Sequence, residues 1–292
     1  MDAERMDWER LFLPAARREG FYWTADADVS GSSIWDKLAR EDSVHAAISA
    51  SGESHEREKS QSQIALLKNE VAGGVALDVG CGYGRLAKYL LPHQRLDGYI
   101  GLDGSLTMLS EFAARNEQRT EERRTPLALV LSPIDDIPLR DESVQYVFLC
   151  GVLLHNPKHV NRCVIQEAYR VLVPGGKLLV VGPDFHNQRT MSGLLSDMVL
   201  VYLRLTGQPD RNGPTRPYSI TELSRLFAPF SRTLYQPRGF HLLSKGLPGL
   251  TPFLNRRYRQ FLSGPFNWLA ELLAPEMVKE RMCDWWWIRA IK

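Results

Sequence analysis

The chain contains little cysteine and no long uninterrupted apolar run. Its 292 residues include four cysteines, none in C-x-x-C spacing, which argues against a disulfide framework and a cysteine-based zinc site. The N-terminal stretch MDAERMDWER is charged where a secretory signal needs apolar residues. The most apolar stretch, residues 191–207, contains Asp197 and Arg204, and a membrane-spanning helix needs roughly 18 uninterrupted apolar residues. These absences predict a cytoplasmic protein without a transmembrane segment.

The chain also lacks an excess of charge of one sign. Its formal net charge is +2, so the bulk charge does not indicate a nucleic-acid-binding protein. We find no internal repeat and no low-complexity tract. With 44% apolar and 24% charged residues, the composition is typical of one large or two small globular domains with a substantial core.

Between residues 71 and 182, short apolar runs alternate with amphipathic stretches. This alternation is typical of βαβ units that build a parallel sheet. Runs such as VQYVFLC are apolar on both faces, as expected for strands that helices cover on each side. We predict strands at residues 75–80, 98–103, 127–132, 144–150 and 177–182.

The flanks of this region carry weaker signals. Ser219 and Glu222 have the S-x-x-E spacing of a capping box, which predicts the start of a helix. The tail CDWWWIRAIK, residues 283–292, is rich in residues that favour strands, and we predict the last strand there. The predicted parts of the chain are an N-terminal helical cap at 1–70, an α/β core at 71–185 and a C-terminal part at 186–292.

A glycine-rich turn follows the first predicted strand, in the stretch ALDVGCGYGRLAKYL. Gly80, Gly82 and Gly84 permit positive φ angles and a close approach of the backbone to a ligand. In the dinucleotide fingerprint G-x-G-x-x-G, the third glycine would stand where this chain has Arg85. A nicotinamide-dependent oxidoreductase is therefore disfavoured.

Two aspartates flank the turn. Asp78 comes just before it, where a carboxylate would repel a phosphate but suits a cationic or amine-bearing ligand. Asp103 ends the next predicted strand, 21 residues beyond Gly82, where a carboxylate can accept both hydroxyls of a ribose. Asp103 could also cap the helix that is predicted to follow it.

The order of several motifs resembles that of the class I S-adenosylmethionine-dependent methyltransferases, especially their small-molecule enzymes. ALDVGCGYGRLAKYL is similar to the first motif of this family, YIGLDGSLTMLSEF to the second, LSPIDDIPLRDESVQYVFLCGVLLH to the third and fourth, and EAYRVLVPGGKLLVVGP to the fifth. The resemblance is strong over residues 71–182. It implies a Rossmann-like, seven-stranded, mostly parallel sheet with helices on both faces, lid elements at both ends of the chain, and S-adenosyl-L-methionine as cofactor.

The resemblance also implies which residues bind this methyl donor. Cys150 and Gly151, at the end of the fourth predicted strand, would lie beside its methionine portion. Many relatives have an acid for the adenine amino group where this chain has Pro133, so Asp135 or a backbone carbonyl must take that role. The other expected contacts are Asp78, Gly80, Cys81 and Gly82 with the amino-acid moiety, Asp103 with the ribose hydroxyls, and Ile134 with Asp135 at the adenine.

Two histidines are candidates for a general base. The methyl group of the donor is already activated, so alignment of the acceptor supplies most of the rate, and a base adds about 10²- to 10⁴-fold where the acceptor must lose a proton. His155 follows the fourth predicted strand and His186 the fifth, with Asp184 near enough to orient it. His155 could equally cap the next helix or pack in the core, and Asp184 and His186 could be exposed loop residues.

The remaining candidates concern metal binding and the acceptor pocket. His155 and His159 are four residues apart, but Pro157 between them disfavours a regular helix and we find no third ligand, so we expect no metal site. Aromatic residues of the flanks are candidates for an acceptor pocket, although aromatics more often belong to the core. These aromatic candidates are Tyr22, Trp23 and Tyr218.

The near-neutral total charge conceals a basic segment. Residues 186–260 contain eleven basic and three acidic side chains, a net charge of +8, which leaves −6 for the rest of the chain. This segment is also apolar in part and interrupted by Pro and Gly, which suits a lid over a partly apolar, anionic acceptor: a phosphorylated, carboxylated, lipid-linked or carrier-tethered molecule. A solvated basic face, or peripheral attachment to an anionic membrane, would explain the same charge.

The sequence thus predicts methyl transfer to the O, N or C atom of a small organic acceptor. An RNA methyltransferase with the basic segment as its footprint is an alternative, although no N-P-P-Y-type or P-C motif and no RNA-binding module is evident. A non-catalytic S-adenosylmethionine-binding partner protein is another. Acceptor specificity in such folds has no portable motif, and the sequence gives no indication of the oligomeric state.

Overall fold

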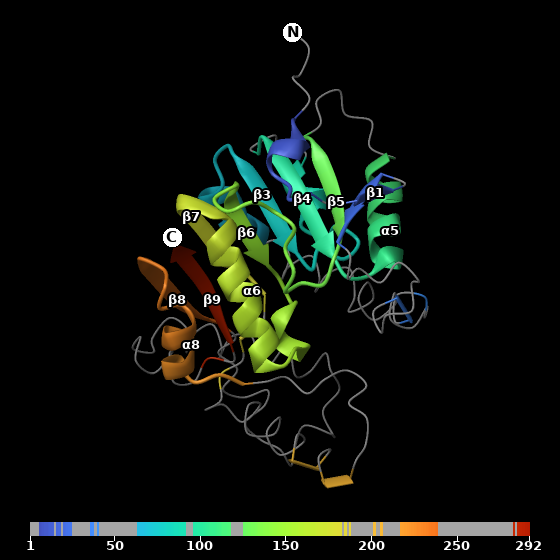
Figure 1. The fold of residues 1–292 in the computed structure, drawn as a ribbon. Helices are drawn as coiled ribbons and strands as arrows, with labels where there is room; N and C mark the ends of the chain where they lie inside the picture. The colour runs from blue at the N-terminus through green and yellow to red at the C-terminus, as the bar shows by residue number, and fades with distance from the viewer. Residues whose placement is uncertain are drawn as a thin grey trace, which may run out of the picture. The chain divides into compact units, whose positions relative to one another are not determined.

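In the computed structural model, most of the core and parts of both flanks can be described (Figure 1). The chain forms two compact units. The first comprises residues 1–150, 163–179 and 291–292, and the second comprises residues 151–162 and 180–290. The residues that the structure describes are 6–14, 16–18, 20–24, 36–37, 40, 63–91, 96–117, 125–182, 184–185, 187, 201–202, 205–206, 217–238, 283 and 285–292.

A mostly parallel sheet is the centre of the first unit. Its strand order is β1-β2-β5-β4-β3-β6-β7, and the pairs β2–β5, β5–β4, β4–β3 and β3–β6 are parallel. The inner strands are buried almost throughout, which explains why their sequences are apolar on both faces. The strands are β1 (Ala16–Arg18), β2 (Phe21–Trp23), β3 (Val75–Val79), β4 (Gly98–Asp103), β5 (Leu127–Leu131), β6 (Val144–Leu149) and β7 (Leu172–Val180), whose last residue belongs to the second unit.

The predicted core strands are confirmed, and the largest shift of a boundary is at β7. β7 begins at Leu172, whereas the sequence predicted a start at 177. The run Pro174-Gly175-Gly176 looks like a break, but here it is part of the strand. Gly175 has φ +78°, its N–H donates to the carbonyl of Lys292 (3.1 Å), and the Lys292 N–H donates to the carbonyl of Gly176 (3.0 Å). The distant partner Lys292 thus holds these glycines within the strand.

The N-terminal part differs from its prediction. The helical cap predicted at 1–70 does contain a helix at 63–70, but it also contains the antiparallel hairpin β1–β2, and β2 adds in parallel to β5. Phe12 and Tyr22 stack with ring centroids 4.2 Å apart. The predicted seven-stranded sheet was therefore too small, because the described residues contain nine strands and the sequence prediction omitted this hairpin.

Helices pack against the sheet of the first unit. α5 (Leu106–Glu117) contacts β4 and β5 and buries Leu109 and Phe112, and residues 63–70 form a further helix. α6 (Lys158–Val171) belongs to the first unit from Cys163 onward. The shorter helical elements are η1 (Trp8–Arg10) and α4 (Ala87–Leu90).

The second unit has a small core of its own. Phe185 meets Tyr218 and Phe227 edge to face at 5.0 and 5.7 Å. The predicted capping box is confirmed, because Ser219 and Glu222 each bond the backbone N–H of the other. The predicted last strand is also confirmed, as β9. The elements are η3 (Leu153–His155), α8 (Ile220–Leu226), β8 (Arg232–Arg238) and β9 (Trp285–Ile291), whose last residue belongs to the first unit.

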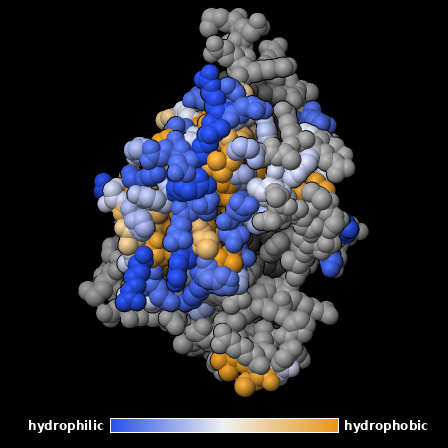
Figure 2. Space-filling model, in the orientation of Figure 1, coloured by the Kyte–Doolittle hydropathy of each residue, from blue (hydrophilic) through white to orange (hydrophobic). Residues whose placement is uncertain are grey.

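One face of the molecule is seen in the space-filling view of Figure 2. Hydrophilic residues predominate among those coloured in Figure 2. The exposed exceptions include Val201, Tyr202 and Leu205 of the second unit, with 55%, 56% and 82% of their surface accessible. In the described part of the chain, we find no helix that is long and apolar enough to cross a membrane.

Candidate functional site

The glycine turn between β3 and α4 has the conformation that its sequence predicts. Gly80, Gly82 and Gly84 have φ angles of +67°, +53° and +80°, a region that side chains with a Cβ rarely adopt. The N–H groups of Gly80 and Cys81 both donate to the carbonyl of Leu102, at 2.7 and 3.0 Å. The turn is therefore fixed against the end of β4.

Two of these glycines have different surroundings. A Cβ on Gly84 would lie 2.5 Å from the ring of Phe112, so this glycine permits α5 to pack. A Cβ on Gly82 would meet no atom of the described residues within 4 Å. The open side of Gly82 is suited to the close approach of a ligand.

Asp103 connects this turn to α5. Its Oδ2 accepts from the Gly82 N–H at 2.8 Å and its Oδ1 from the Ser105 N–H at 2.9 Å. The side chain is half-buried, and desolvation raises its pKa to about 6 against the lowering effect of the backbone N–H groups. The capping role considered from the sequence is not what the structure shows, because the first turn of α5 is capped by Ser105 Oγ, which accepts from the Met108 N–H at 3.2 Å, and by Asp36, which accepts from the Thr107 N–H at 2.8 Å.

Asp78 lies before the turn and is buried, with 2% of its surface accessible. The hydroxyl of Tyr99 on β4 donates to its Oδ2 at 2.5 Å. Burial raises the pKa of Asp78 to about 7, although the Tyr99 hydrogen bond and the charge of Arg85 oppose this rise. Sequence reasoning missed Tyr99, because only the parallel register of β3 with β4 reveals this contact.

Arg85 has a further role that its position in the motif did not predict. Its guanidinium donates to Gln63 Oε1 at 2.9 Å and to Cys150 Sγ at 2.7 Å. Because Cys150 directly follows β6, the arginine connects the glycine turn to the end of a second strand. Cys81 is buried, and desolvation raises the pKa of its thiol well above the usual value.

The segment after β5 begins beside Asp103. The Ser132 N–H donates to the Asp103 carbonyl at 3.1 Å, and the Ser132 hydroxyl donates to the Asp136 carbonyl at 2.6 Å. Between them Ile134, which is half-buried, and Asp135, which is exposed, form a turn. The structure thus places the residues predicted for ribose and adenine on neighbouring strand ends.

In the second unit, Asp184 is buried within a loop network. Its carboxylate accepts the N–H groups of Gly151, Val152 and Leu153 at 2.8, 2.6 and 2.7 Å. Asp184 is therefore not the exposed loop residue that the sequence left open. His186, the base that it was expected to orient, lies outside the described residues.

The other predicted acceptor residues lie in separate elements. His155 ends η3, and Pro157 follows before α6 begins. Tyr218 is buried and its hydroxyl accepts from Asn161 Nδ2 at 2.9 Å. Tyr22 is buried against Phe12, and Trp23 is half-buried. The role of these three aromatic residues in an acceptor pocket stays a prediction.

No cluster of three or more His, Cys, Asp or Glu side chains that could hold a metal ion occurs among the described residues. Residues 77–180 match the family described as "Methyltransferase domain". This region is a methyltransferase domain. It contains the glycine turn, both aspartates and the segment after β5.

Curated relatives of the methyltransferase domain match over only part of their length. The chain is 32% identical to 2-phytyl-1,4-naphtoquinone methyltransferase of Nostoc punctiforme over 116 residues, 39% of this chain and 48% of that protein. It is 33% identical to demethylmenaquinone methyltransferase of Oceanobacillus iheyensis over 114 residues, 39% of this chain and 46% of that protein. The match thus spans less than half of each of these relatives.

A solved structure shows the same fold. Phosphoethanolamine N-methyltransferase 2 of Haemonchus contortus, in complex with phosphomonomethylethanolamine and S-adenosylhomocysteine, aligns with a TM-score of 0.51 and 16% identity. The alignment covers 80% of this chain and 52% of that one. The Rossmann-like architecture expected from the sequence is confirmed.

Proposed function

We propose that this protein is an S-adenosylmethionine-dependent methyltransferase that acts on a small organic acceptor. The observation that carries the proposal is the Asp103 carboxylate, which is held by the Gly82 N–H beside a backbone position that is open to a ligand. A nucleoside with two ribose hydroxyls suits the half-buried carboxylate, and a cationic donor suits the neighbouring Asp78. The family match of residues 77–180 supports the same assignment.

The residues present fit the donor. Gly82 permits its close approach, Asp103 would accept the ribose hydroxyls, and the turn Ile134–Asp135 would face the adenine. Asp78, Gly80 and Cys81 would lie by the amino-acid moiety, with Cys150 and Gly151 beside the methionine portion. The bound donor would supply an activated methyl group on a sulfonium, and the chain would orient the acceptor and exclude water.

For the acceptor, we favour a small molecule that is partly apolar or anionic. The two curated relatives are named as methyltransferases of quinones, which are partly apolar molecules. Residues 186–260 of this chain carry a net charge of +8, which suits an anionic molecule. We propose that this segment covers the acceptor, that Tyr22, Trp23 and Tyr218 help to shape the pocket, and that peripheral contact with an anionic membrane is a secondary role of the same charge.

The donor assignment is tested by thermal denaturation with S-adenosylhomocysteine. At 100 times its Kd, a ligand that binds only the folded protein adds about 2.7 kcal/mol to the free energy of unfolding. A dinucleotide is the matched control. Strong stabilisation by the dinucleotide and none by S-adenosylhomocysteine would contradict the proposal.

Transfer itself is tested with a tritiated methyl donor. We expect label in small-molecule extracts and not in total RNA. Label in RNA would instead support the nucleic-acid methyltransferase, and donor binding without transfer to either would support a non-catalytic partner protein.

The general base is tested by His155→Ala and His186→Ala. We expect at most one of them to lower kcat by about 10²-fold or more. His159→Ala, on the exposed first turn of α6, is the control. Full activity of both variants would mean that alignment alone supplies the rate or that another residue is the base.

A further inference from the structure

The segment that follows β5 is held along both of its edges. Ile137 and Leu139 are buried, each with 1% of its surface accessible. Pro138 lies between them in a tight turn, which is closed by the bond from the Leu139 N–H to the Ile137 carbonyl at 2.8 Å. One side faces Arg170 of α6, and the other faces the N-terminal residues.

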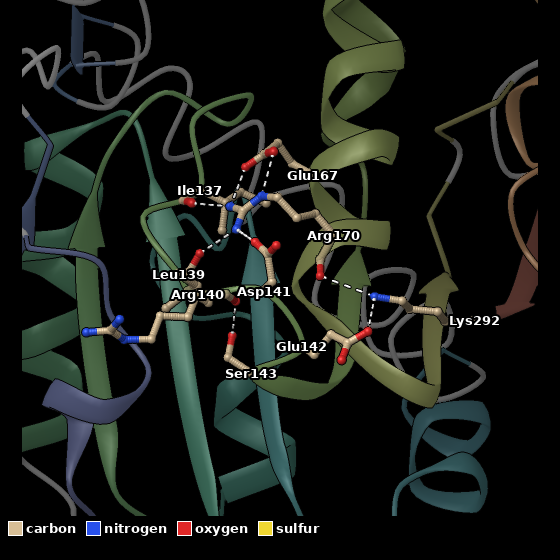
Figure 3. A network of polar contacts seen from close by, with 9 residues as sticks. All are labelled: Ile137, Leu139, Arg140, Asp141, Glu142, Ser143, Glu167, Arg170 and Lys292. Atoms are coloured by element: carbon tan, nitrogen blue, oxygen red, sulfur yellow. Dashed lines mark hydrogen bonds and ion pairs between the residues drawn. The ribbon is translucent and has the colours of Figure 1, made fainter.

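Arg170 fixes the first side with its whole guanidinium (Figure 3). It donates to the carbonyl oxygens of Ile137 and Leu139 at 2.8 and 2.7 Å. Its other N–H groups donate to both carboxylate oxygens of Glu167, at 2.9 and 2.7 Å, and to Asp141 at 2.7 Å. All five donors of the side chain are thus used, which a lysine could not reproduce.

The N-terminal residues fix the second side. The Leu13 N–H donates to the Pro138 carbonyl at 3.0 Å, and the Arg140 N–H donates to the Leu11 carbonyl at 2.8 Å. These bonds flank the antiparallel bridge between Phe12 and Leu139.

A third attachment lies at the start of the segment. The hydroxyl of Thr24, the residue after β2, is 3.1 Å from that of Ser132. Ser132 also closes the turn that contains Ile134 and Asp135 through its bond to Asp136. The turn is therefore anchored at Ser132 on one side and at Ile137 on the other.

We propose that Arg170 and the N-terminal residues Leu11, Leu13 and Thr24 form a two-sided clamp that positions the turn Ile134–Asp135 for the adenine of the donor. This inference rests on the proposed function. It makes Arg170 a positioning residue that acts through the carbonyls of Ile137 and Leu139. It also makes the N-terminal residues part of the donor site, although the methyltransferase-domain match begins only at residue 77.

The experiment measures selectivity for the base. Calorimetry gives the affinities for S-adenosylhomocysteine and S-inosylhomocysteine, which differ at the position of the adenine amino group. Arg170→Lys keeps the charge but loses donors, Leu13→Pro removes the N–H that bonds Pro138, and Thr24→Val removes the hydroxyl that meets Ser132. We expect each variant to bind S-adenosylhomocysteine about fivefold to tenfold more weakly and to lose most of the preference for it over S-inosylhomocysteine.

Two matched controls separate positioning from general destabilisation. Leu13→Ala keeps the N–H group, and Lys292→Met removes the bond to the Arg170 carbonyl (3.3 Å) without altering the bonds to Ile137 and Leu139. We expect both to keep the affinity and the preference of the wild type. Thr24→Val changes one partly buried contact with no change of backbone, so it remains informative if Leu13→Pro does not fold.

The outcomes are distinguishable. If Arg170→Lys, Leu13→Pro and Thr24→Val all keep the wild-type preference for S-adenosylhomocysteine over S-inosylhomocysteine, the proposed clamp is wrong, whether or not binding is weaker. The donor assignment would still stand in that case. If the wild type does not bind S-adenosylhomocysteine, the proposed function itself has failed.

Discussion

Asp103 and Asp184 are two aspartates near the carboxyl ends of strands, β4 and β7, and both accept backbone N–H groups. Asp103 bonds Gly82 and Ser105 and remains half-buried. Asp184 is fully buried and bonds three successive N–H groups, from Gly151 to Leu153. Asp103 is a partly accessible residue beside Gly82, whereas Asp184 is enclosed by the loop that it organises.

This difference shows how the same side chain acquires a binding or a structural role. A carboxylate has about four acceptor sites, and accessibility decides whether a ligand can reach those that the backbone does not use. We therefore expect replacement of Asp103 to affect mainly donor affinity and replacement of Asp184 to affect mainly folding.

The largest effect is expected for Asp184→Ala. It leaves three N–H groups without their acceptor, and we expect the free energy of unfolding to fall by about 3–5 kcal/mol. Urea denaturation measures this loss. A fall of less than about 1 kcal/mol would contradict an anchoring role and would remove the contrast with Asp103.

Asp103→Ala is expected to weaken S-adenosylhomocysteine binding by about 30- to 100-fold, because the two ribose hydroxyls lose their charged hydrogen-bond acceptor. Its effect on stability should be smaller than that of Asp184→Ala, because the raised pKa of Asp103 shows that its ionised form is disfavoured by burial. Calorimetry and urea denaturation of the same samples give both values. Unchanged affinity would exclude this carboxylate from the donor site.

A smaller effect is expected from pH. Asp103 and Asp78 have pKa values of about 6 and about 7, and the donor needs their ionised forms, so its affinity should fall about tenfold or more from pH 8 to pH 5.5. The stability of the ligand-free protein is expected to change with pH in the opposite direction. Because the pKa values of both aspartates are higher in the folded protein than the ordinary value of 3.8, protonation stabilises the fold. This contribution is complete below pH 3.8 and is lost as the pH rises through 6 to 7.

Tyr99→Phe sharpens this pH test. The Tyr99 hydroxyl lowers the pKa of Asp78, so its removal should move the upper part of the pH dependence to higher pH. The ring that remains can keep its contact with Phe148, 6.5 Å between centroids. Thermal shifts with and without S-adenosylhomocysteine, measured across the same pH range, report both stability and binding. Identical pH profiles for the wild type and Tyr99→Phe would exclude an influence of Asp78 on binding.

Local signals in the sequence predicted much of the fold. The alternation of apolar runs located the core strands, the glycines located the turn, and the spacing of Ser219 and Glu222 located the start of α8. Each of these features depends on residues that are close together in the chain, so its physical cause is visible in the sequence.

Features that depend on distant partners were missed. The hairpin β1–β2 has strands of three residues, too short for a periodic signal, and it forms because β5 offers an edge. Likewise, the partners of Arg85 and Arg170 and the bond from Tyr99 to Asp78 follow from strand order and register. The acceptor residues stay predictions, because His186 lies outside the described residues and side-chain types alone do not define a pocket.

The parallel pairing of β2 with β5 also has a consequence for the order of folding. Phe21 pairs with Leu129, 108 residues later in the chain, and contacts so distant in sequence form slowly because a long loop must close first. During synthesis, residues 21–23 emerge well before the strand that receives them. The N-terminal segment can pair locally as the hairpin β1–β2, but it lacks its β5 partner until the sheet from β3 to β5 exists, so its docking is expected to be a late step in folding.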